Sequence, residues 1–371
     1  MSLGDRLVGM KLSPLDSRHR QARAKMADFG GWLMPIDYPD TGTLAEHAAV
    51  RERVGLFDVS HLGKASVKGK GALEFLNSAL TNDLNRIVDG QAQYTMLCND
   101  AGGVIDDLIV YRKSAQDFFL VPNASNTADV VATLKKNAPS GIEVVNLHEE
   151  YGVIAIQGPD SLAVLHSLGV ETQMDYMNFS HANIGGAEVI LCRTGYTGEY
   201  GFELLPRWDD ALQVWDSLVT AMKAFDGMVC GLGARDTLRT EMGYPLHGHE
   251  LSLEITPIQA GANWAVGWKK SGFTAENVLR DERENGAPKN LYAMLVVGKG
   301  IPRAGMSIKS VDGKILGEVT SGTFSPTLKN GIALGFSAEK LFPGDRIVID
   351  VRGRDCEMEI VKLPFVASHV R

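Results

Sequence analysis

Residues 102–111 read Gly-Gly-Val-Ile-Asp-Asp-Leu-Ile-Val-Tyr, a glycine turn followed by an apolar run that contains two carboxylates. The turn and the β-branched residues after it predict a strand over 104–111. Because side chains alternate between the faces of a strand, Asp106 and Asp107 are expected to point in opposite directions, into otherwise apolar surroundings. Burial raises the pKa of a carboxyl group, so at least one of them is a candidate for proton transfer or cation stabilisation. The alternative is an aspartate bound by turn amides beside Gly103.

The segments on either side of this run predict an α+β fold. Helical spacing of apolar residues alternates with strand-like spacing along the chain. We expect strands at 56–60, 64–68, 94–97, 118–121, 142–146, 153–156, 187–193 and 202–205, and helices at 43–53, 71–80, 126–136, 161–168, 208–225 and up to Gly243. This order predicts mixed sheets that are backed by helices.

The composition changes after about Arg280. Short strands separated by turns are expected at 291–297, 306–310, 315–320, 332–336, 346–351 and 357–361, a pattern typical of an all-β domain. Asn330-Gly331 is the expected hairpin turn of this domain. The charged stretch 281–286 is the expected boundary before it.

Length and composition restrict the class of protein. The chain has 371 residues, and at roughly 100 to 200 residues per domain it is expected to form two or three domains. The 44% hydrophobic and 22% charged residues are ordinary for a soluble globular protein, and the net charge of -8 argues against nucleic acid as the main partner. No apolar stretch approaches the roughly 18 residues of a membrane span. The four cysteines include no C-x-x-C pair, which favours a reducing cytosol and a cytoplasmic location.

Two further segments are candidates for ligand binding. The loop Gly195 to Gly201 is rich in glycine and leads to Glu203, whose carboxylate could accept paired N–H bonds from an amidine-like heterocycle such as a pterin. In the segment 231–239, Arg235 is expected near a helix start, where the helix dipole disfavours a cation unless the arginine binds something else. The alternatives are plain turn chemistry for the glycines and a surface pair between Asp236 and Arg239.

Two other clusters are not favoured as sites. His247 and His249, with Glu250 beside them, lack a clear third metal ligand. Ser60 and His61 are adjacent in an extended segment and point to opposite faces, so they do not form a hydrolase triad with Asp58. We therefore expect no metal.

Several blocks, taken in order, resemble one known family over nearly the whole chain. They are Phe29–Pro35, Glu46–Arg51, Gly55–His61, Gly102–Ile109, Gly195–Glu199, Gly231–Arg239 and Thr320–Leu328. Together they resemble the glycine cleavage system T protein family, the aminomethyltransferases. The resemblance implies a three-lobed folate-binding transferase with α+β lobes and a C-terminal antiparallel β-barrel around a central cavity. The implied lobes are 1–57 plus 148–270, 58–147 and 281–371.

The resemblance also implies roles for individual residues. It assigns the catalytic carboxylate to Asp107 and pterin recognition to Glu203 and Arg235. The other residues that it places against the folate are Tyr94, Tyr196, Leu62, Tyr111, Asn123 and Arg371. Leu62 stands where the family commonly has Met, an apolar exchange of similar volume. The segment that ends in Arg371 resembles the family only loosely.

The implied reaction moves an aminomethyl-derived carbon from the lipoyl arm of H protein to tetrahydrofolate, which is a co-substrate. A folate-dependent demethylase on the same fold and a non-catalytic folate-binding module are the alternatives. The encounter with H protein is expected to be transient, and we expect neither a membrane nor a nucleic acid as a partner. The basic cluster Arg18, Arg20, Arg23 and Lys25 is a candidate docking surface, with an ordinary solvated surface as the alternative.

Overall fold

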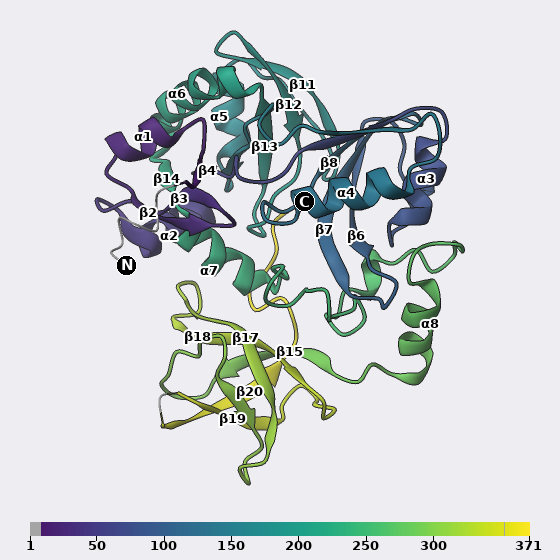
Figure 1. Ribbon diagram of the computed structural model, residues 1–371. Helices are drawn as coiled ribbons and strands as arrows, with labels where there is room; N and C mark the ends of the chain where they lie inside the picture. The colour runs from purple at the N-terminus through teal and green to yellow at the C-terminus, as the bar shows by residue number, and fades with distance from the viewer. Residues whose placement is uncertain (1–8, 352) are drawn as a thin grey trace.

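The carboxylate pair lies in strand β7, Val104–Ser114, of a five-stranded sheet with the order β6-β7-β8-β5-β9. The computed structural model describes residues 9–351 and 353–371 (Figure 1). The other strands are β6 Gln91–Cys98, β8 Asp117–Val121, β5 Ala65–Lys68 and β9 Glu143–Asn146, and all pairs are antiparallel. Helices α3 (Ala72–Ala79) and α4 (Thr127–Asn137) contribute Leu76 and Val130 to the core that covers Leu108 and Val110 of β7. Alternate residues of β7 thus face this core.

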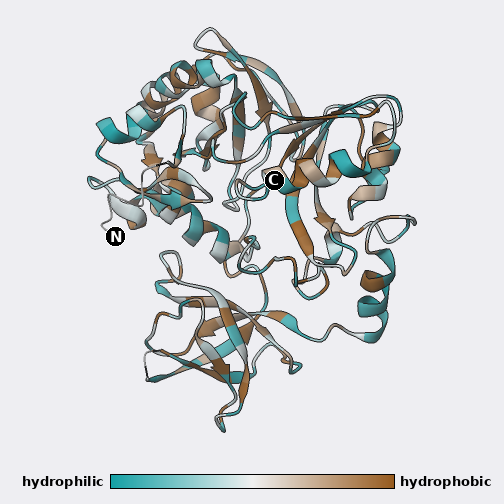
Figure 2. Ribbon diagram, in the orientation of Figure 1, coloured by the Kyte–Doolittle hydropathy of each residue, from teal (hydrophilic) through white to brown (hydrophobic). Residues whose placement is uncertain are grey.

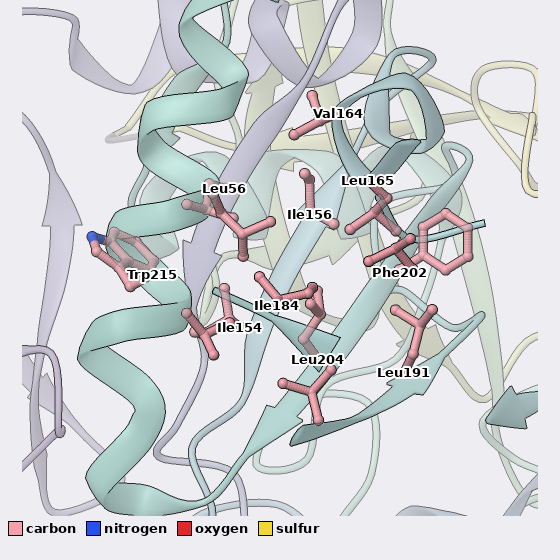
Figure 3. Packing of buried hydrophobic residues seen from close by; sticks show 14 of the residues in the cluster. Leu56, Ile154, Ile156, Val164, Leu165, Ile184, Leu191, Phe202, Leu204 and Trp215 are labelled. Carbon is pink, nitrogen blue, oxygen red and sulfur yellow. The ribbon is translucent and has the colours of Figure 1, made fainter. Parts of the chain in front are cut away.

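A six-stranded mixed sheet, β11-β12-β13-β10-β4-β14, forms the second body. Its strands are β11 Phe179–Ile184, β12 Ala187–Cys192, β13 Gly201–Pro206, β10 Ile154–Gln157, β4 Gly55–Asp58 and β14 Met228–Cys230. Only β14 and β4 pair in parallel, so the expected mixed sheet is found here. Helices α5 (Ser161–Ser167) and α6 (Ala211–Met222) pack Leu165 and Trp215 over Ile154 and Phe202 (Figure 3).

The opposite side of this sheet carries the N-terminal elements and helix α7, Leu232–Met242. A small sheet of β1 Lys11–Leu12, β3 Trp32–Asp37 and β2 Lys25–Phe29 lies with helices α1 Asp16–Gln21 and α2 Gly42–Glu52. Figure 2 shows that the strands are largely hydrophobic, whereas α1 and much of α8 (Glu276–Asn285) are hydrophilic. In the part of the chain that is described, no helix is long and apolar enough to cross a membrane.

The C-terminal strands close into a six-stranded antiparallel barrel, as expected. They are β15 Asn290–Val296, β16 Ser307–Lys309, β17 Ile315–Ser325, β18 Asn330–Ser337, β19 Arg346–Asp350 and β20 Asp355–Val361. Met294, Val319, Ile349 and Met358 fill its interior. Side chains therefore occupy the inside of this small barrel.

One local prediction for this region is wrong. The last pair of the β17–β18 hairpin is Ser325 with Asn330, so the turn is 326–329, and Gly331 lies inside the strand opposite Phe324. A Cβ on Gly331 would lie 2.5 Å from the carbonyl oxygen of Gly300, so this glycine serves a close backbone approach and not a turn. The charged stretch 281–286 forms the last turns of α8, and the chain leaves that helix at Gly286.

Buried charges join the barrel to α7. Glu241 near the end of α7 accepts hydrogen bonds from Ser325 (2.5 Å) and Thr327 (2.9 Å) of the barrel hairpin and from Arg51 (2.7 Å) of α2. After the barrel the chain runs back to the centre of the molecule (Figure 1), where His369 lies 3.0 Å from Glu199. The barrel is thus fixed to the body that carries Glu203 and Arg235.

Candidate active site

Asp106 and Asp107 differ in burial, as strand alternation requires. Asp106 is fully buried on the face of Leu108, and Asp107 is partly exposed on the other face. The backbone N–H of Asn123 (2.9 Å) and the side-chain amide of Asn126 (2.7 Å) donate to Asp106. These bonds tie β7 to the start of α4, so Asp106 has a structural role.

The two carboxylates point to opposite faces, as predicted, but they are linked, because Asn123 bonds to both. Its Nδ2 lies 2.9 Å from Oδ1 of Asp106 and 2.8 Å from Oδ1 of Asp107. Asn123 follows the end of β8, beside β7, and from there its side chain reaches both faces of the strand. The predicted site residue Asn123 is therefore a bridge between the carboxylates.

Tyr94 of β6 completes the surroundings of Asp107. Its hydroxyl donates to Oδ2 of Asp107 at 3.0 Å, and its ring stacks on Trp264 with centroids 5.0 Å apart. Burial raises the pKa of Asp107, and the hydrogen bonds from Tyr94 and Asn123 act in the opposite direction. Burial, and then the charge of Asp107, raise the pKa of Asp106 as well. Together, the carboxyl groups of Asp106 and Asp107 therefore carry less than two full negative charges.

Glu203 of β13 lies in a second cluster. It is buried, and Oε2 accepts a hydrogen bond from the Thr194 hydroxyl at 2.6 Å. The hydroxyl of Tyr111 lies 3.3 Å from the same Thr194 oxygen. Tyr111 thus supports Glu203 through Thr194, with its ring packed among Phe119 and Phe179. No other hydrogen bond to the Glu203 carboxylate is present among the described residues, so Oε1 is free to bind a ligand.

Arg235 lies in the first turn of α7, as predicted, and has no ion-pair partner among the described residues. Its guanidinium is 4.7 Å from the ring centre of Tyr196, and its Nη1 is a buried donor without an acceptor in the described chain. Burial lowers the pKa of Arg235, and the charge of Glu203 opposes that shift. The alternative surface pair forms separately, because Arg239 bonds Asp236 at 2.8 Å.

Electrostatic coupling links these clusters. Burial raises the pKa of Tyr196, and the charges of Arg239, Asp107 and Arg235 also act on that phenol. The Tyr196 hydroxyl is anchored on the carbonyl oxygen of Pro245 at 2.5 Å. Tyr196 therefore lies within electrostatic reach of both the predicted catalytic carboxylate and the predicted pterin-binding arginine.

Leu62 belongs to a loop, residues 59–63, whose carbonyl groups are held by side chains. Nζ of the fully buried Lys64 donates to the carbonyl oxygens of Ser60 (2.9 Å) and Leu62 (2.8 Å). Nε2 of His148 lies 2.9 Å from the carbonyl oxygen of His61 and can contact it only as a donor. Burial lowers the pKa of Lys64 to about 7. The loop that carries Leu62 is thus rigidly placed.

Arg371 makes no hydrogen bond or ion pair to these clusters within the described residues. It lines a hollow of about 640 Å³, whose walls also include Tyr176, Arg193 and Tyr200. None of the other predicted site residues lines this hollow.

The unfavoured clusters have structural partners. His247 lies 3.0 Å from the carbonyl oxygen of Val104, and Glu250 pairs with Arg239 at 3.1 Å. Asp58 pairs with His19 at 2.8 Å inside the protein, whereas Ser60 bonds to the backbone of Val153. Residues 9–351 and 353–371 contain no group of three or more His, Cys, Asp or Glu side chains arranged to hold a metal.

Two parts of this site were not predicted from the sequence. Thr194 directly precedes the glycine loop and lies near Glu203 because Cys192 pairs with Glu203 between β12 and β13. That pairing is a contact between strands, so the local sequence carries no signal for Thr194. Trp264 has no local signal either, since it comes from a short 3₁₀ turn at 263–265.

Comparison with known proteins finds relatives over nearly the whole chain. A family model described as the GCVT N-terminal domain matches residues 15–270, and one for the glycine cleavage T-protein C-terminal barrel domain matches residues 289–367. The chain is 54% identical over 362 residues to the aminomethyltransferase of Parafrankia sp. (strain EAN1pec), covering 98% of this chain and 99% of that protein. It is also 54% identical over 360 residues to that of Mycobacterium tuberculosis (strain ATCC 25618 / H37Rv), covering 96% and 97%.

A solved structure has the same fold. The glycine cleavage system aminomethyltransferase T from Bartonella henselae matches with a TM-score of 0.91 and 33% sequence identity, covering 97% of this chain and 99% of that one. The chain therefore belongs to the glycine cleavage T-protein family of aminomethyltransferases.

Proposed function

We propose that this enzyme transfers the carbon of an aminomethyl group from the lipoyl arm of H protein to tetrahydrofolate. The carbon leaves sulfur and nitrogen and becomes the bridge between N5 and N10 of the folate. The two protons displaced from N5 and N10 end on the released ammonia and on the lipoyl thiol, so no oxidant or reductant is consumed. The products are 5,10-methylenetetrahydrofolate, ammonia and dihydrolipoyl H protein.

The observation that carries this proposal is the pair of unsatisfied groups at Glu203 and Arg235. Oε1 of Glu203 is free among the described residues, and Nη1 of Arg235 is a buried donor with no acceptor in that part of the chain. A pterin offers both complements, because its amidine edge donates paired N–H bonds and its carbonyl oxygen accepts one. The residues present therefore fit the pterin ring.

Asp107 is suited to the chemical step. Its carboxylate is held by Tyr94 and Asn123, so it need not reorient when positive charge develops on the migrating carbon and its nitrogen. A fixed negative group in a poorly solvated place stabilises such charge more than water does. Asp107 would also orient the folate amines toward the incoming aminomethyl group.

We also propose that the encounter with H protein is transient, since a long lipoyl arm needs only a small docking surface. The basic cluster is a weaker candidate for this surface than its sequence suggested. Arg18 pairs with Asp216, Arg20 with Asp16 and Arg23 with Asp40, so most of its positive charge is locally balanced. We propose a cytoplasmic location, which the four buried free cysteines support.

The decisive experiment is an ammonia-release assay. Purified enzyme, tetrahydrofolate and aminomethyl-loaded H protein should release ammonia and form 5,10-methylenetetrahydrofolate in equal amounts. The controls are apo H protein, which lacks the lipoyl arm, and small methylated amines offered without H protein. Release from the methylated amines but not from loaded H protein would replace this proposal with a demethylase. Folate binding without turnover of either donor would indicate a non-catalytic module.

A further inference from the structure

His61 is a buried imidazole whose ring nitrogens have no partner in the described chain. The residue is 2% exposed. Nδ1 is a buried atom without a hydrogen bond, and Nε2 makes no hydrogen bond to a described residue either. Other buried histidines do have partners, because His19 lies 2.8 Å from Asp58 and Nδ1 of His47 lies 2.8 Å from the hydroxyl of Thr237. A buried polar group without a partner costs stability, so His61 needs an explanation.

The imidazole of His61 is neutral. Burial lowers its pKa to about 3, and the positive charge of Arg235 acts in the same direction. A neutral imidazole has one N–H that donates and one nitrogen that accepts. The ring makes a T-shaped contact with Phe29, with centroids 5.1 Å apart. Such a group suits a polar ligand atom that carries no charge.

The backbone around His61 is held in place by side chains. Lys64 donates to the carbonyl oxygens of Ser60 and Leu62, and His148 contacts the carbonyl oxygen of His61 itself. These bonds use the backbone groups of the loop and leave the imidazole unpaired. The loop therefore presents the ring of His61 in a fixed place.

The loop of His61 lies close to both clusters of the candidate active site. The N–H of Gly63 donates to the carbonyl oxygen of Pro122 at 2.8 Å, and a Cβ on Gly63 would lie 2.7 Å from the Pro122 side chain. Pro122 directly precedes Asn123, which holds the carboxylate proposed for the chemical step. The charge that acts most on His61 is that of Arg235, in the pterin cluster. His61 thus belongs to neither cluster alone.

The order of groups around a pterin ring indicates which atom His61 would meet. The ring carbonyl has the amidine edge on one flank and N5 on the other. Glu203 is proposed for the amidine edge and Arg235 for the carbonyl, so a group beside Arg235 and toward Asp107 lies next to N5. In tetrahydrofolate N5 carries a hydrogen, which an unpaired imidazole nitrogen can accept.

We propose that His61 is a specificity-determining residue that accepts a hydrogen bond from N5–H of tetrahydrofolate. This inference rests on the proposed function and adds to it a contact at one of the two reacting nitrogens. The bond points the N5 hydrogen at His61 and leaves the lone pair of N5 free for the incoming carbon. It is lost once the carbon replaces that hydrogen, so His61 holds the substrate more tightly than the product.

The test compares the affinities of tetrahydrofolate and of 5-deazatetrahydrofolate, in which a carbon replaces N5, by titration calorimetry. That carbon neither donates nor accepts, while the amidine edge and the carbonyl are unchanged. The wild type should bind tetrahydrofolate about five- to tenfold more tightly, the factor expected of one neutral hydrogen bond in a buried site. His61→Phe, which keeps a flat ring against Phe29, should bring the ratio close to one.

Three further variants complete the test. His61→Gln keeps an amide that can accept a hydrogen bond, and it should restore part of the ratio. Phe29→Leu changes the packing around the imidazole but keeps both nitrogens, so it is the matched control and should keep the wild-type ratio. Circular dichroism melts accompany all variants, and the smaller His61→Leu gives the same comparison if His61→Phe does not fold. A ratio of affinities cancels any general effect of a variant on the pterin pocket.

Failure of this inference can be told from failure of the proposed function. If tetrahydrofolate binds but the wild-type ratio is near one, or if His61→Phe and His61→Leu leave the ratio unchanged, His61 does not contact N5 and the proposed function stands. If neither folate binds to the wild type, the proposed function fails and the inference fails with it.

Discussion

The hydroxyl of Tyr94 donates to Oδ2 of Asp107 at 3.0 Å, while Asn123 donates to Oδ1 of the same carboxylate at 2.8 Å. The two donors come from different neighbours of β7, and together they fix the plane of the carboxylate. Burial favours the neutral form of Asp107, and these donors favour the charged form. The balance between burial and these hydrogen bonds sets the fraction of Asp107 that is ionised during the reaction.

Asp107→Asn should lower kcat by roughly 10² or more and change folate affinity only a few-fold, because the amide has the same shape but no charge. Asp106→Asn should affect activity far less and lower the melting temperature instead, since Asp106 holds Asn123 and Asn126. Steady-state kinetics and thermal melts of both variants check this. An equal loss of kcat in the two variants would show that the carboxylates act as one unit through Asn123.

Tyr94→Phe should move the acid limb of the kcat–pH profile to higher pH. The tyrosine hydrogen bond favours the charged carboxylate, so its removal raises the pKa of Asp107 further above its ordinary value. The ionised fraction then falls at a higher pH as acid is added. A profile of kcat between pH 5 and 9 measures the shift. An acid limb in the same place would mean that another group produces it, and Tyr196→Phe, which keeps the Tyr94 bond, is the comparison.

The sequence indicates the candidate residues of this site more readily than the contacts between them. The chemistry of Asp107, Glu203 and Arg235 follows from charged residues in apolar or glycine-rich surroundings, which is a local property. The bridge made by Asn123 depends on β8 ending beside β7, a pairing between segments that are apart in the chain. Thr194 and Trp264 were missed for the same reason, because only tertiary packing gives them a role.

The same difference between local sequence pattern and tertiary packing applies to the prediction of the fold. Long amphipathic helices and most apolar strands after residue 55 were predicted within a few residues, and the barrel followed from strand spacing, but the buried strand β3 was not predicted. Short, partly exposed strands such as β2 and β14 were not predicted, since they carry little hydrophobic periodicity. The stretch 281–286 was predicted as a boundary because it is charged and polar, and it forms the last turns of α8, which exposes most of its surface and needs few apolar residues. Local composition alone does not distinguish a charged connecting segment from an exposed helix.

Glu203→Ala should weaken tetrahydrofolate binding by about 2 kcal/mol or more, because charge-assisted hydrogen bonds in buried sites are the strong ones. The loss should appear for folate alone, without H protein, in titration calorimetry. Glu188→Ala is a suitable control, since Glu188 is an exposed glutamate on β12 of the same sheet. Equal affinities of the wild type and Glu203→Ala would remove Glu203 from the pterin site.

Lys64→Met should change the pH dependence of stability. The pKa of Lys64 is about 7 in the folded protein, below its ordinary value, so between about pH 7 and 10 only the unfolded chain carries this proton. The free energy of unfolding of the wild type therefore gains about 2 to 3 kcal/mol from pH 7 to 9 through this group, and the variant lacks that gain. Urea unfolding at pH 6, 7.5 and 9 tests it. Lys68→Met, an exposed lysine on β5, should leave the curve parallel to the wild type; a parallel curve for Lys64→Met would contradict the prediction.

Glu241→Gln should loosen the attachment of the barrel to α7. Burial alone would raise the pKa of Glu241, but its contact with His47, the Ser325 hydroxyl and the charge of Arg51 lower it to about 2. A carboxyl whose folded pKa is lowered stabilises the protein above its unfolded value near 4.5, and that contribution is lost as the pH falls toward 2.

At pH 7 the neutral amide of Glu241→Gln leaves Arg51 with one carboxylate partner, Glu199, among the described residues. We expect a loss of about 3 kcal/mol, typical of breaking a buried ion pair, and a smaller loss of stability between pH 5 and 2 than in the wild type. Glu339→Gln removes an exposed partner of Lys314 in the barrel and should cost less than about 1 kcal/mol. Chemical unfolding of the wild type and of both variants at pH 7 and 3 gives the six values needed. If Glu241→Gln were no less stable than Glu339→Gln at pH 7, the buried charges would contribute nothing to holding the barrel, and its attachment would depend on apolar contacts and neutral hydrogen bonds alone.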